Sequence, residues 1–390
     1  MEIVSSVYHV FSASVVFFVG ALVSICFGKS FGVASAKSLT LYFWHTAFSV
    51  FYCLYALRIG GDAVSYYHYG QEWTGRISFG TASVRAMSAL LVSGFGLSIL
   101  GTFMVFNIFG QIGLLAFWGS LREAVAGKSG QVRVLVPVII FLPSVSFWSS
   151  ALGKDAIAFM ATGLALWSSL SLSRRGLLMM LAISLMLIVR PHMAGIMVMA
   201  IGLAALMDPK ASALKKVGLV CVAVGFAAVL VPFALRYAGV GSEVDAQALA
   251  DYIDKRQSYN TEGGGGVDVA SMSLPVQLFT YLFRPVIFEA RNVFALAASL
   301  DNLLLLGLFV VGGFALLRRR KSGLNENRTF MWAYSLGSWL VLAMTTANLG
   351  IALRQKWMFV PMLIFLLISV IGRSRVPDEA TPVSLGGERR

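Results

Sequence analysis

The chain has 390 residues, of which 58% are hydrophobic and only 13% are charged. A soluble protein of this length needs far more charged side chains to cover its surface, so the composition excludes an ordinary soluble domain. The net charge of +13 would suit nucleic-acid binding, but the positions of the basic residues decide against it. Cys26, Cys53 and Cys221 stand singly within apolar runs, which indicates core residues rather than disulfides or metal ligands.

Apolar runs near the length of a bilayer crossing recur along the whole chain. They predict an all-α polytopic membrane protein with about eleven transmembrane helices. The start of the chain lacks the basic region of a cleavable signal peptide, so the first run is expected to be a retained span. In chain order, the expected spans are residues 8–28, 39–57, 97–119, 134–149, 156–173, 176–189, 193–207, 217–238, 296–317, 329–346 and 357–372.

The basic loops predict the orientation of these spans. Lysine and arginine cluster at 174–175, 210–216 and 318–321, which fall on one side of the predicted membrane. The positive-inside rule makes that side cytoplasmic, so the N-terminus is expected outside and the C-terminus inside. This assignment places 19 Lys and Arg against 6 Asp and Glu on the cytoplasmic side, and 12 against 12 on the outer side. Membrane topology thereby explains the net charge, and no nucleic-acid partner is expected.

A single transmembrane helical domain is expected over residues 1–376, followed by a cytoplasmic tail, 377–390, that is expected to be disordered. Two long outer loops, 58–96 and 239–295, interrupt the spans. The second loop contains a run of four glycines and leads toward Arg284. It is either a hinged lid over a site or plain surface.

The predicted outer segments hold an unusual set of arginines. Arg190, Arg284 and Arg354 each adjoin apolar sequence on the side where the positive-inside rule does not require them. Ionisable side chains at membrane depth are costly and usually face a cavity, and guanidinium groups match phosphate oxygens. These residues therefore predict a cavity for a lipid that carries a pyrophosphate. The candidate substrate-binding residues are Arg190, Arg284, Arg291, Arg354, Lys154, Tyr66 and Tyr67, and the candidate catalytic residues are Asp62, Glu289 and His192.

Each candidate also has a purely structural interpretation. Arginine and lysine at span ends often extend to the membrane interface, and tyrosine there forms an ordinary aromatic belt. Lys154 and Asp155 form either a local ion pair or the start of a helix that Asp155 caps. Glu289 is either a base or the ion-pair partner of an arginine, and His45 is expected to be a hydrogen-bonded core residue.

The motifs that the chain lacks narrow the class of enzyme. It contains no P-loop, no HExxH and no GxSxG motif. A cytoplasmic enzyme that uses ATP or a nucleotide sugar is therefore disfavoured, and neither a cofactor nor a metal ion is expected. If the chain is an enzyme, its donor substrate arrives already activated on a lipid.

The organisation of the chain resembles a known group of enzymes. Many spans, outer arginines and a first outer loop that reads "GGDAVSYYHYG" resemble membrane glycosyltransferases of the GT-C superfamily. Within that group, the chain is most similar in character to the Wzy-type polymerases of bacterial oligosaccharide repeats. Three further phrases resemble bacterial membrane proteins of polysaccharide synthesis, namely "PSVSFWSSALGKDAIAF", "VRPHMAG" and "YLFRPVIFEARN".

The resemblance implies glycan transfer or polymerisation from an undecaprenyl-pyrophosphate carrier, at the periplasmic face of the bacterial inner membrane, during cell-surface or exopolysaccharide synthesis. The implied partners are the polyprenyl-pyrophosphate-linked oligosaccharide, membrane lipids and other polysaccharide-assembly proteins. Outer arginines would bind the pyrophosphate, and an acidic residue or a histidine would assist the acceptor hydroxyl. By position, Asp62 resembles the first-loop acid of the superfamily, but it lacks an adjacent second acid and follows the second predicted span rather than the first.

Two other functions use the same residues differently. A transporter or flippase of a lipid-linked glycan, or of another anion, would place the arginines along a path through the bundle. Such a path carries polar residues through the midplane, and many transporters show internal repeats. Charges inside the predicted spans are scarce and no repeat is evident, which favours an enzyme at the outer face. A non-catalytic subunit of an export complex would leave the outer arginines unexplained.

Overall fold

The structure is a computed structural model of the chain. The tail 377–390, the predicted lid and most of the predicted span 217–238 lie outside the described residues. The structure describes residues 2–72, 75, 78–209, 212–214, 216–222, 224, 225, 228, 272–318, 322 and 327–372.

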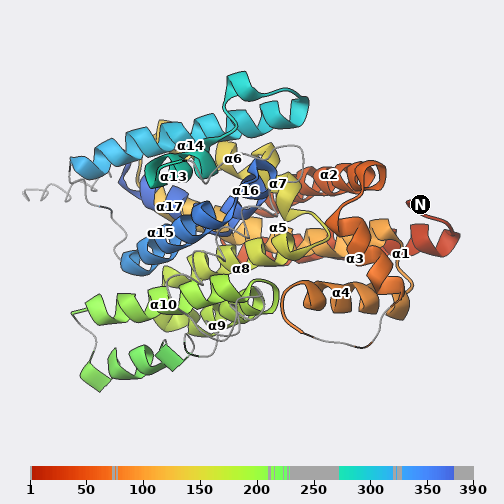
Figure 1. Cartoon of the computed structure of the whole chain (residues 1–390), viewed down its shortest axis with the longest axis horizontal. Helices are drawn as coiled ribbons and strands as arrows, with labels where there is room; N and C mark the ends of the chain where they lie inside the picture. The colour runs from red at the N-terminus through yellow and green to blue at the C-terminus, as the bar shows by residue number, and fades with distance from the viewer. Residues whose placement is uncertain are drawn as a thin grey trace, which may run out of the picture.

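The described residues form helices and no strand (Figure 1). Most of the long helices follow the long axis of the molecule. In chain order, the segments are α1 (Val7–Ser30), α2 (Ser35–Ile59), α3 (Asp62–Gln71), α4 (Thr81–Ala89), η1 (Leu90–Gly94), α5 (Ile99–Ala124), α6 (Gly130–Ile140), α7 (Pro143–Ser149), α8 (Lys154–Ser169), α9 (Leu172–Val189), α10 (Pro191–Met207), α13 (Leu274–Phe283), η2 (Ile287–Glu289), α14 (Val293–Leu317), α15 (Arg328–Thr345), α16 (Leu349–Gln355), η3 (Lys356–Met358) and α17 (Val360–Val370).

The length and composition of these helices are those of a polytopic membrane protein. Within the described residues, 5 segments are long and apolar enough to cross a membrane, and up to 7 if each of two sharply bent pairs is one span. The bent pairs are α2 with α3, at 84°, and α16–η3 with α17, at 63°. The all-helical membrane class is therefore confirmed, whereas the number of eleven spans and the orientation stay predictions.

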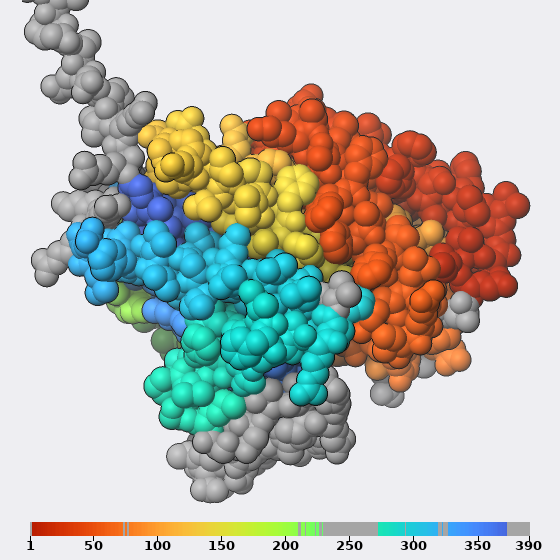
Figure 2. Space-filling model, turned by 90° about the horizontal axis from the view of Figure 1, so that it is seen from above, coloured from red at the N-terminus to blue at the C-terminus, as the bar shows by residue number. Residues whose placement is uncertain are grey.

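Helices α5 and α8 form the centre of the bundle. The two helices approach closely because each has glycine at the contact: a Cβ built on Gly113 would lie only 2.8 Å from the Cα of Met160, and one on Gly163 would lie 3.0 Å from the Cα of Gly113. Helices α1 and α14 instead expose apolar side chains, such as Phe11 and Phe314, and α14 lies across one face of the molecule (Figure 2). Exposed apolar helices around a buried core are what a lipid environment requires.

At the C-terminal end of α17, a buried lysine satisfies the last carbonyl groups of the helix. Lys128 Nζ donates to the carbonyl oxygens of Ile368 and Ser369, both at 2.7 Å, and of Ile371 at 2.8 Å. Arg328 Nη1 donates to Ser369 Oγ at 2.7 Å. Cations favour the C-terminal carbonyl groups of a helix, and both residues belong to the side that the sequence predicts as cytoplasmic.

The close contact between α5 and α8 gives a stability prediction. Replacing Gly113 with Ala forces the backbone of α8 to move, so the free energy of unfolding should fall by about 1–3 kcal/mol. Thermal unfolding of the purified chain in detergent measures this change. Gly313→Ala on α14 is the matched control, because its Cβ would meet nothing within 4 Å. Equal effects of the two substitutions would contradict the tight packing of α5 on α8.

Candidate functional site

A buried carboxylate lies at the point where several helices begin or end. Asp155 belongs to the first turn of α8, and its side chain is only 14% exposed. Arg190 Nη2 donates to Asp155 Oδ1 at 2.7 Å, and Arg354 Nε lies 3.9 Å from Asp155 Oδ2. A buried carboxylate is stable only when paired, and here one guanidinium group faces each oxygen. The ion-pair partners of Asp155 therefore come from distant parts of the chain, not from its neighbour Lys154.

Arg354 links this buried carboxylate to a second, exposed one. Its Nη1 donates to Asp62 Oδ2 at 3.0 Å, although the two residues are 292 positions apart. The side chain of Asp62 is 60% exposed, whereas that of Arg354 is 24% exposed. We refer to Asp62, Lys154, Asp155, Arg190 and Arg354 as the charged junction.

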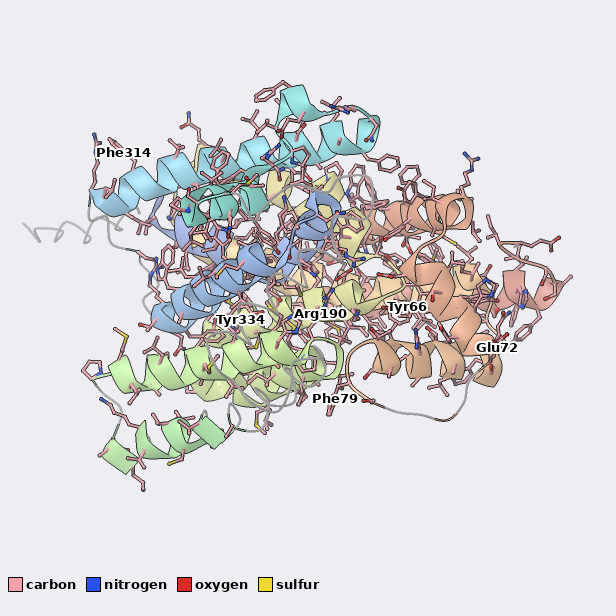
Figure 3. The ribbon with its side chains drawn as sticks, viewed as in Figure 1. Tyr66, Glu72, Phe79, Arg190, Phe314 and Tyr334 are labelled. Atoms are coloured by element: carbon pink, nitrogen blue, oxygen red, sulfur yellow. The ribbon has the colours of Figure 1, made fainter. Side chains whose placement is uncertain are left out.

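Lys154 and Tyr66 belong to the same neighbourhood. Lys154 Nζ donates to Thr81 Oγ1 at 3.0 Å. Tyr66 is buried, and a Cβ built on Gly153 would lie 3.6 Å from its ring, so the ring packs beside the start of α8. Figure 3 shows Arg190 near the middle of the molecule, between the labelled Tyr66 and Tyr334.

A proline holds Arg190 at its place in the junction. Pro191 has no backbone N–H and begins α10, so the helical hydrogen bonds stop after α9 and Arg190 adopts a non-helical conformation, with φ −143° and ψ 71°. The break frees the carbonyl of Ile188, which accepts from Gly80 N at 2.7 Å and from Ser83 Oγ at 3.0 Å. The break falls between the expected spans 176–189 and 193–207, and Gly80 and Ser83 stabilise it.

Four buried donor groups in and beside the junction have no hydrogen-bond partner in the described part of the chain. Among the described residues, no hydrogen-bond partner exists for Arg190 Nε, Arg354 Nε, Tyr281 Oη or Trp357 Nε1. Tyr281 and Trp357 are 3% and 4% exposed, and Tyr281 lies within electrostatic range of Arg190 and Asp155. A buried donor without a partner costs about 1–3 kcal/mol, so natural structures contain few of them. A water molecule or a ligand that accepts hydrogen bonds would satisfy such donors.

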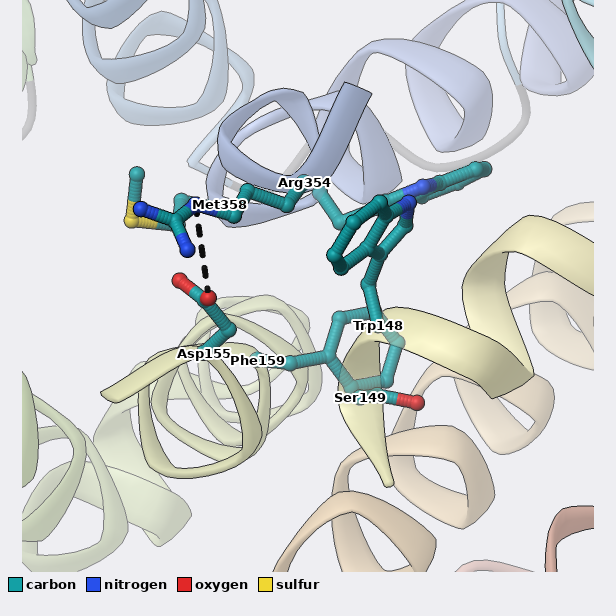
Figure 4. A pocket seen from close by; sticks show the side chains of 7 residues that line it. Trp148, Ser149, Asp155, Phe159, Arg354 and Met358 are labelled. Atoms are coloured by element: carbon teal, nitrogen blue, oxygen red, sulfur yellow. Dashed lines mark ion pairs between the residues drawn. The ribbon is translucent and has the colours of Figure 1, made fainter. Parts of the chain in front are cut away.

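Aromatic side chains line the pocket beside the junction (Figure 4). The figure shows Asp155 and Arg354 facing each other across the ion pair, with Trp148 and Phe159 beside them. The empty space is about 190 Å³, including the part that opens to solvent. None of this space is wide enough for a water molecule, so the site is closed in this conformation. The lining residues are Trp148, Ser149, Asp155, Phe159, Arg354, Trp357 and Met358.

Two of the predicted residues form a separate ion pair. Arg284 Nε and Nη2 lie 2.9 and 2.5 Å from Glu289 Oε1, and Val286 N donates to Glu289 Oε2 at 2.9 Å. Hydrogen bonds from Arg284, followed by the one from Val286, lower the pKa of Glu289. Within the described residues, this pair makes no ion pair with the charged junction. Glu289 is therefore the ion-pair partner of an arginine, which was one of its two interpretations.

The remaining candidates lie in different surroundings. His192 is exposed in the first turn of α10, and Arg291 is exposed just before α14. Tyr67 is buried in the hydrophobic core. The structure therefore brings Asp62, Tyr66, Lys154, Arg190 and Arg354 together, and it places Arg284, Glu289, Arg291, His192 and Tyr67 in other environments.

Sequence reasoning missed a second buried polar group beside the junction. Lys356 is 1% exposed, and its ammonium group donates to the amide oxygen of Asn302. Asn302 Nδ2 donates to the carbonyl of Pro285 at 3.0 Å, and Asp301 Oδ2 accepts from Ser144 N at 2.9 Å. These contacts connect η3 to α14 and to the Arg284 segment. The sequence shows these polar residues within apolar runs, but it does not show which residues they contact.

His45 is fully buried and its Nε2 lies 2.8 Å from Ser149 Oγ, which confirms the expected hydrogen-bonded core residue. A group of three or more His, Cys, Asp or Glu side chains that would hold a metal ion is absent from the described part of the chain.

No protein-family model, no curated protein and no solved structure matches this chain. The resemblance to polysaccharide polymerases therefore stays an expectation, and the functional argument depends on the chemistry of the charged junction.

The pairing of Asp155 gives a second stability prediction. Arg190→Ala leaves a buried carboxylate without its direct partner, so the free energy of unfolding should fall by about 3–5 kcal/mol. The double variant Arg190→Met with Asp155→Leu should restore part of this loss, because it removes the buried carboxylate together with its partner. Arg58→Ala, at the exposed end of α2, is the control. Thermal unfolding in detergent measures all three, and an equal loss in the single and double variants would contradict the pairing.

Proposed function

We propose that the chain is a membrane glycosyltransferase or polymerase. It transfers glycan units from an undecaprenyl-pyrophosphate carrier at the periplasmic face of the bacterial inner membrane, during synthesis of a surface polysaccharide. The charged junction holds the pyrophosphate group of the carrier, and the acceptor glycan approaches from the exposed side of Asp62.

The observation that carries this proposal is the group of unpaired buried donors around Asp155. Arg190 and Arg354 converge on one carboxylate, yet the Nε group of each has no hydrogen-bond partner among the described residues. The hydroxyl of Tyr281 and the indole N–H of Trp357 also have no hydrogen-bond partner among these residues. Donors of this kind suit a ligand rich in oxygen acceptors and negative charge, and a phosphate group has both properties.

The same geometry explains how the site would accelerate glycosyl transfer. Negative charge develops on the pyrophosphate oxygens as the bond to the sugar breaks. Guanidinium groups that are already held in a buried site stabilise this charge without reorganising, because Asp155 fixes Arg190 and Arg354 beforehand. The carboxylate of Asp62 is exposed beside them and has the chemistry to accept the proton of an acceptor hydroxyl.

A complementation experiment tests this function. A strain that lacks the chain would receive the wild type, Arg354→Ala or the control Arg58→Ala, and its lipid-linked oligosaccharides would be identified by mass spectrometry. Loss of one charge-stabilising group lowers such rates by about 10²–10³-fold. Arg354→Ala should therefore accumulate single repeat units on the outer leaflet, detected with an impermeant probe, while Arg58→Ala behaves as wild type.

Protein amount in the membrane and melting temperature must be compared among the same variants, so that a folding defect is recognised. Accumulation on the inner leaflet would contradict glycosyl transfer and indicate a flippase. Unchanged lipid-linked glycans in the strain without the chain would show that the junction binds a different anion.

A further inference from the structure

The two carboxylates of the charged junction differ in a way that separates their roles. Asp155 is 14% exposed and sits between two guanidinium groups, whereas Asp62 is 60% exposed and touches only Arg354 among the ion pairs of the described residues. Separating Asp155 from its two arginines is costly, because water cannot reach the buried carboxylate to replace them. An exposed ion pair contributes little, about 0–1 kcal/mol, so Asp62 can leave Arg354 at small cost.

We propose that Asp62 is an exchangeable plug: its carboxylate occupies the phosphate position on Arg354 when substrate is absent, and an incoming diphosphate displaces it. This inference rests on the proposed function, because it takes the diphosphate as the ligand of the junction. Asp155 stays in place and keeps Arg190 and Arg354 oriented in both states.

The geometry of Arg354 supports an exchange of one anion for another. A carboxylate and a phosphate present oxygens of similar spacing to the guanidinium group, so both use the same N–H donors. Asp62 already accepts from Nη1 at 3.0 Å, while Nε has no hydrogen-bond partner among the described residues. A diphosphate that took both donors would satisfy one more buried N–H group than Asp62 does.

The charge of the junction points the same way. Three cations, Lys154, Arg190 and Arg354, lie within electrostatic range of the two carboxylates, Asp62 and Asp155. When Asp62 turns away, two positive charges remain without a balancing carboxylate, which suits the multiple negative charges of a diphosphate. With Asp62 in place, only one such positive charge remains, so the plug limits the exposure of unbalanced arginines in the absence of substrate.

Two glycines with positive φ precede Asp62. Gly60 and Gly61 connect α2 to α3 with φ angles of 84° and 111°, which glycine adopts without strain. A Cβ built on either glycine would meet nothing within 4 Å, so the space around the turn is open. The bend of 84° between α2 and α3 is located at this pair, and Asp62 is the first residue of α3 after it. A change of backbone conformation at the two glycines would move the Asp62 carboxylate relative to Arg354.

Binding to the purified, full chain in detergent tests the plug. The probes are farnesyl diphosphate as a lipid diphosphate, inorganic pyrophosphate as a free anion, and farnesol as a lipid without charge, each titrated by calorimetry. Asp62→Asn removes the competing charge but keeps the shape, so its Kd for farnesyl diphosphate should be about two- to fivefold lower than that of wild type, as the loss of an exposed ion pair predicts. Glu72→Gln, at the exposed end of α3, removes the same charge without touching Arg354 and should leave the Kd unchanged.

Each outcome decides a separate statement. Tighter binding by Asp62→Asn but not by Glu72→Gln supports the plug, and an equal gain with inorganic pyrophosphate identifies the diphosphate group alone as the ligand. Wild-type binding that Asp62→Asn does not tighten, or weakens, overturns the plug and leaves the phosphate site intact. Absence of diphosphate binding in all variants, or equal binding of farnesol, overturns the plug and the proposed function together.

Discussion

The arrangement of the charged junction depends on one buried carboxylate. Asp155 is removed from water at the start of α8, and a charge in such a place must be paired. Its partners, Arg190 and Arg354, come from the α9–α10 break and from α16, so one electrostatic requirement fixes three separate helix ends relative to each other. Tyr281 and Trp357 then lie around a cluster whose geometry this carboxylate sets.

The charged junction combines a closely packed carboxylate with an exposed one. The close contact of α5 with α8, through Gly113 and Gly163, leaves the helix that carries Asp155 little freedom to shift. Asp62 pairs with the same Arg354, but it follows two glycines and its side chain is 60% exposed. A site with one fixed and one movable counter-ion can hold its arginines ready and still admit an anion, and this combination supports both the proposed function and the proposed exchange.

Several residues of the junction could be predicted because unusual chemistry marks them in the sequence. Arg190 and Arg354 adjoin apolar runs on the side where basic residues are not expected, and Pro191 predicts the break that positions Arg190. By the same reasoning, Arg284 looked equivalent to them, but the structure shows it occupied by Glu289, five residues away. Its ion pair with Glu289, which the sequence left as one of two interpretations, distinguishes Arg284 from Arg190 and Arg354.

The sequence by itself determined the class of the protein, since apolar runs of bilayer length leave few alternatives to a bundle of helices. It also determined which polar groups a membrane protein would have to accommodate. Only the tertiary structure decided that Asp155 pairs with Arg190 and Arg354 rather than with Lys154, and that Asp62 meets Arg354. The physical reason is that helix periodicity acts over a few residues, whereas the partner of a buried charge is chosen by packing between helices that lie hundreds of positions apart.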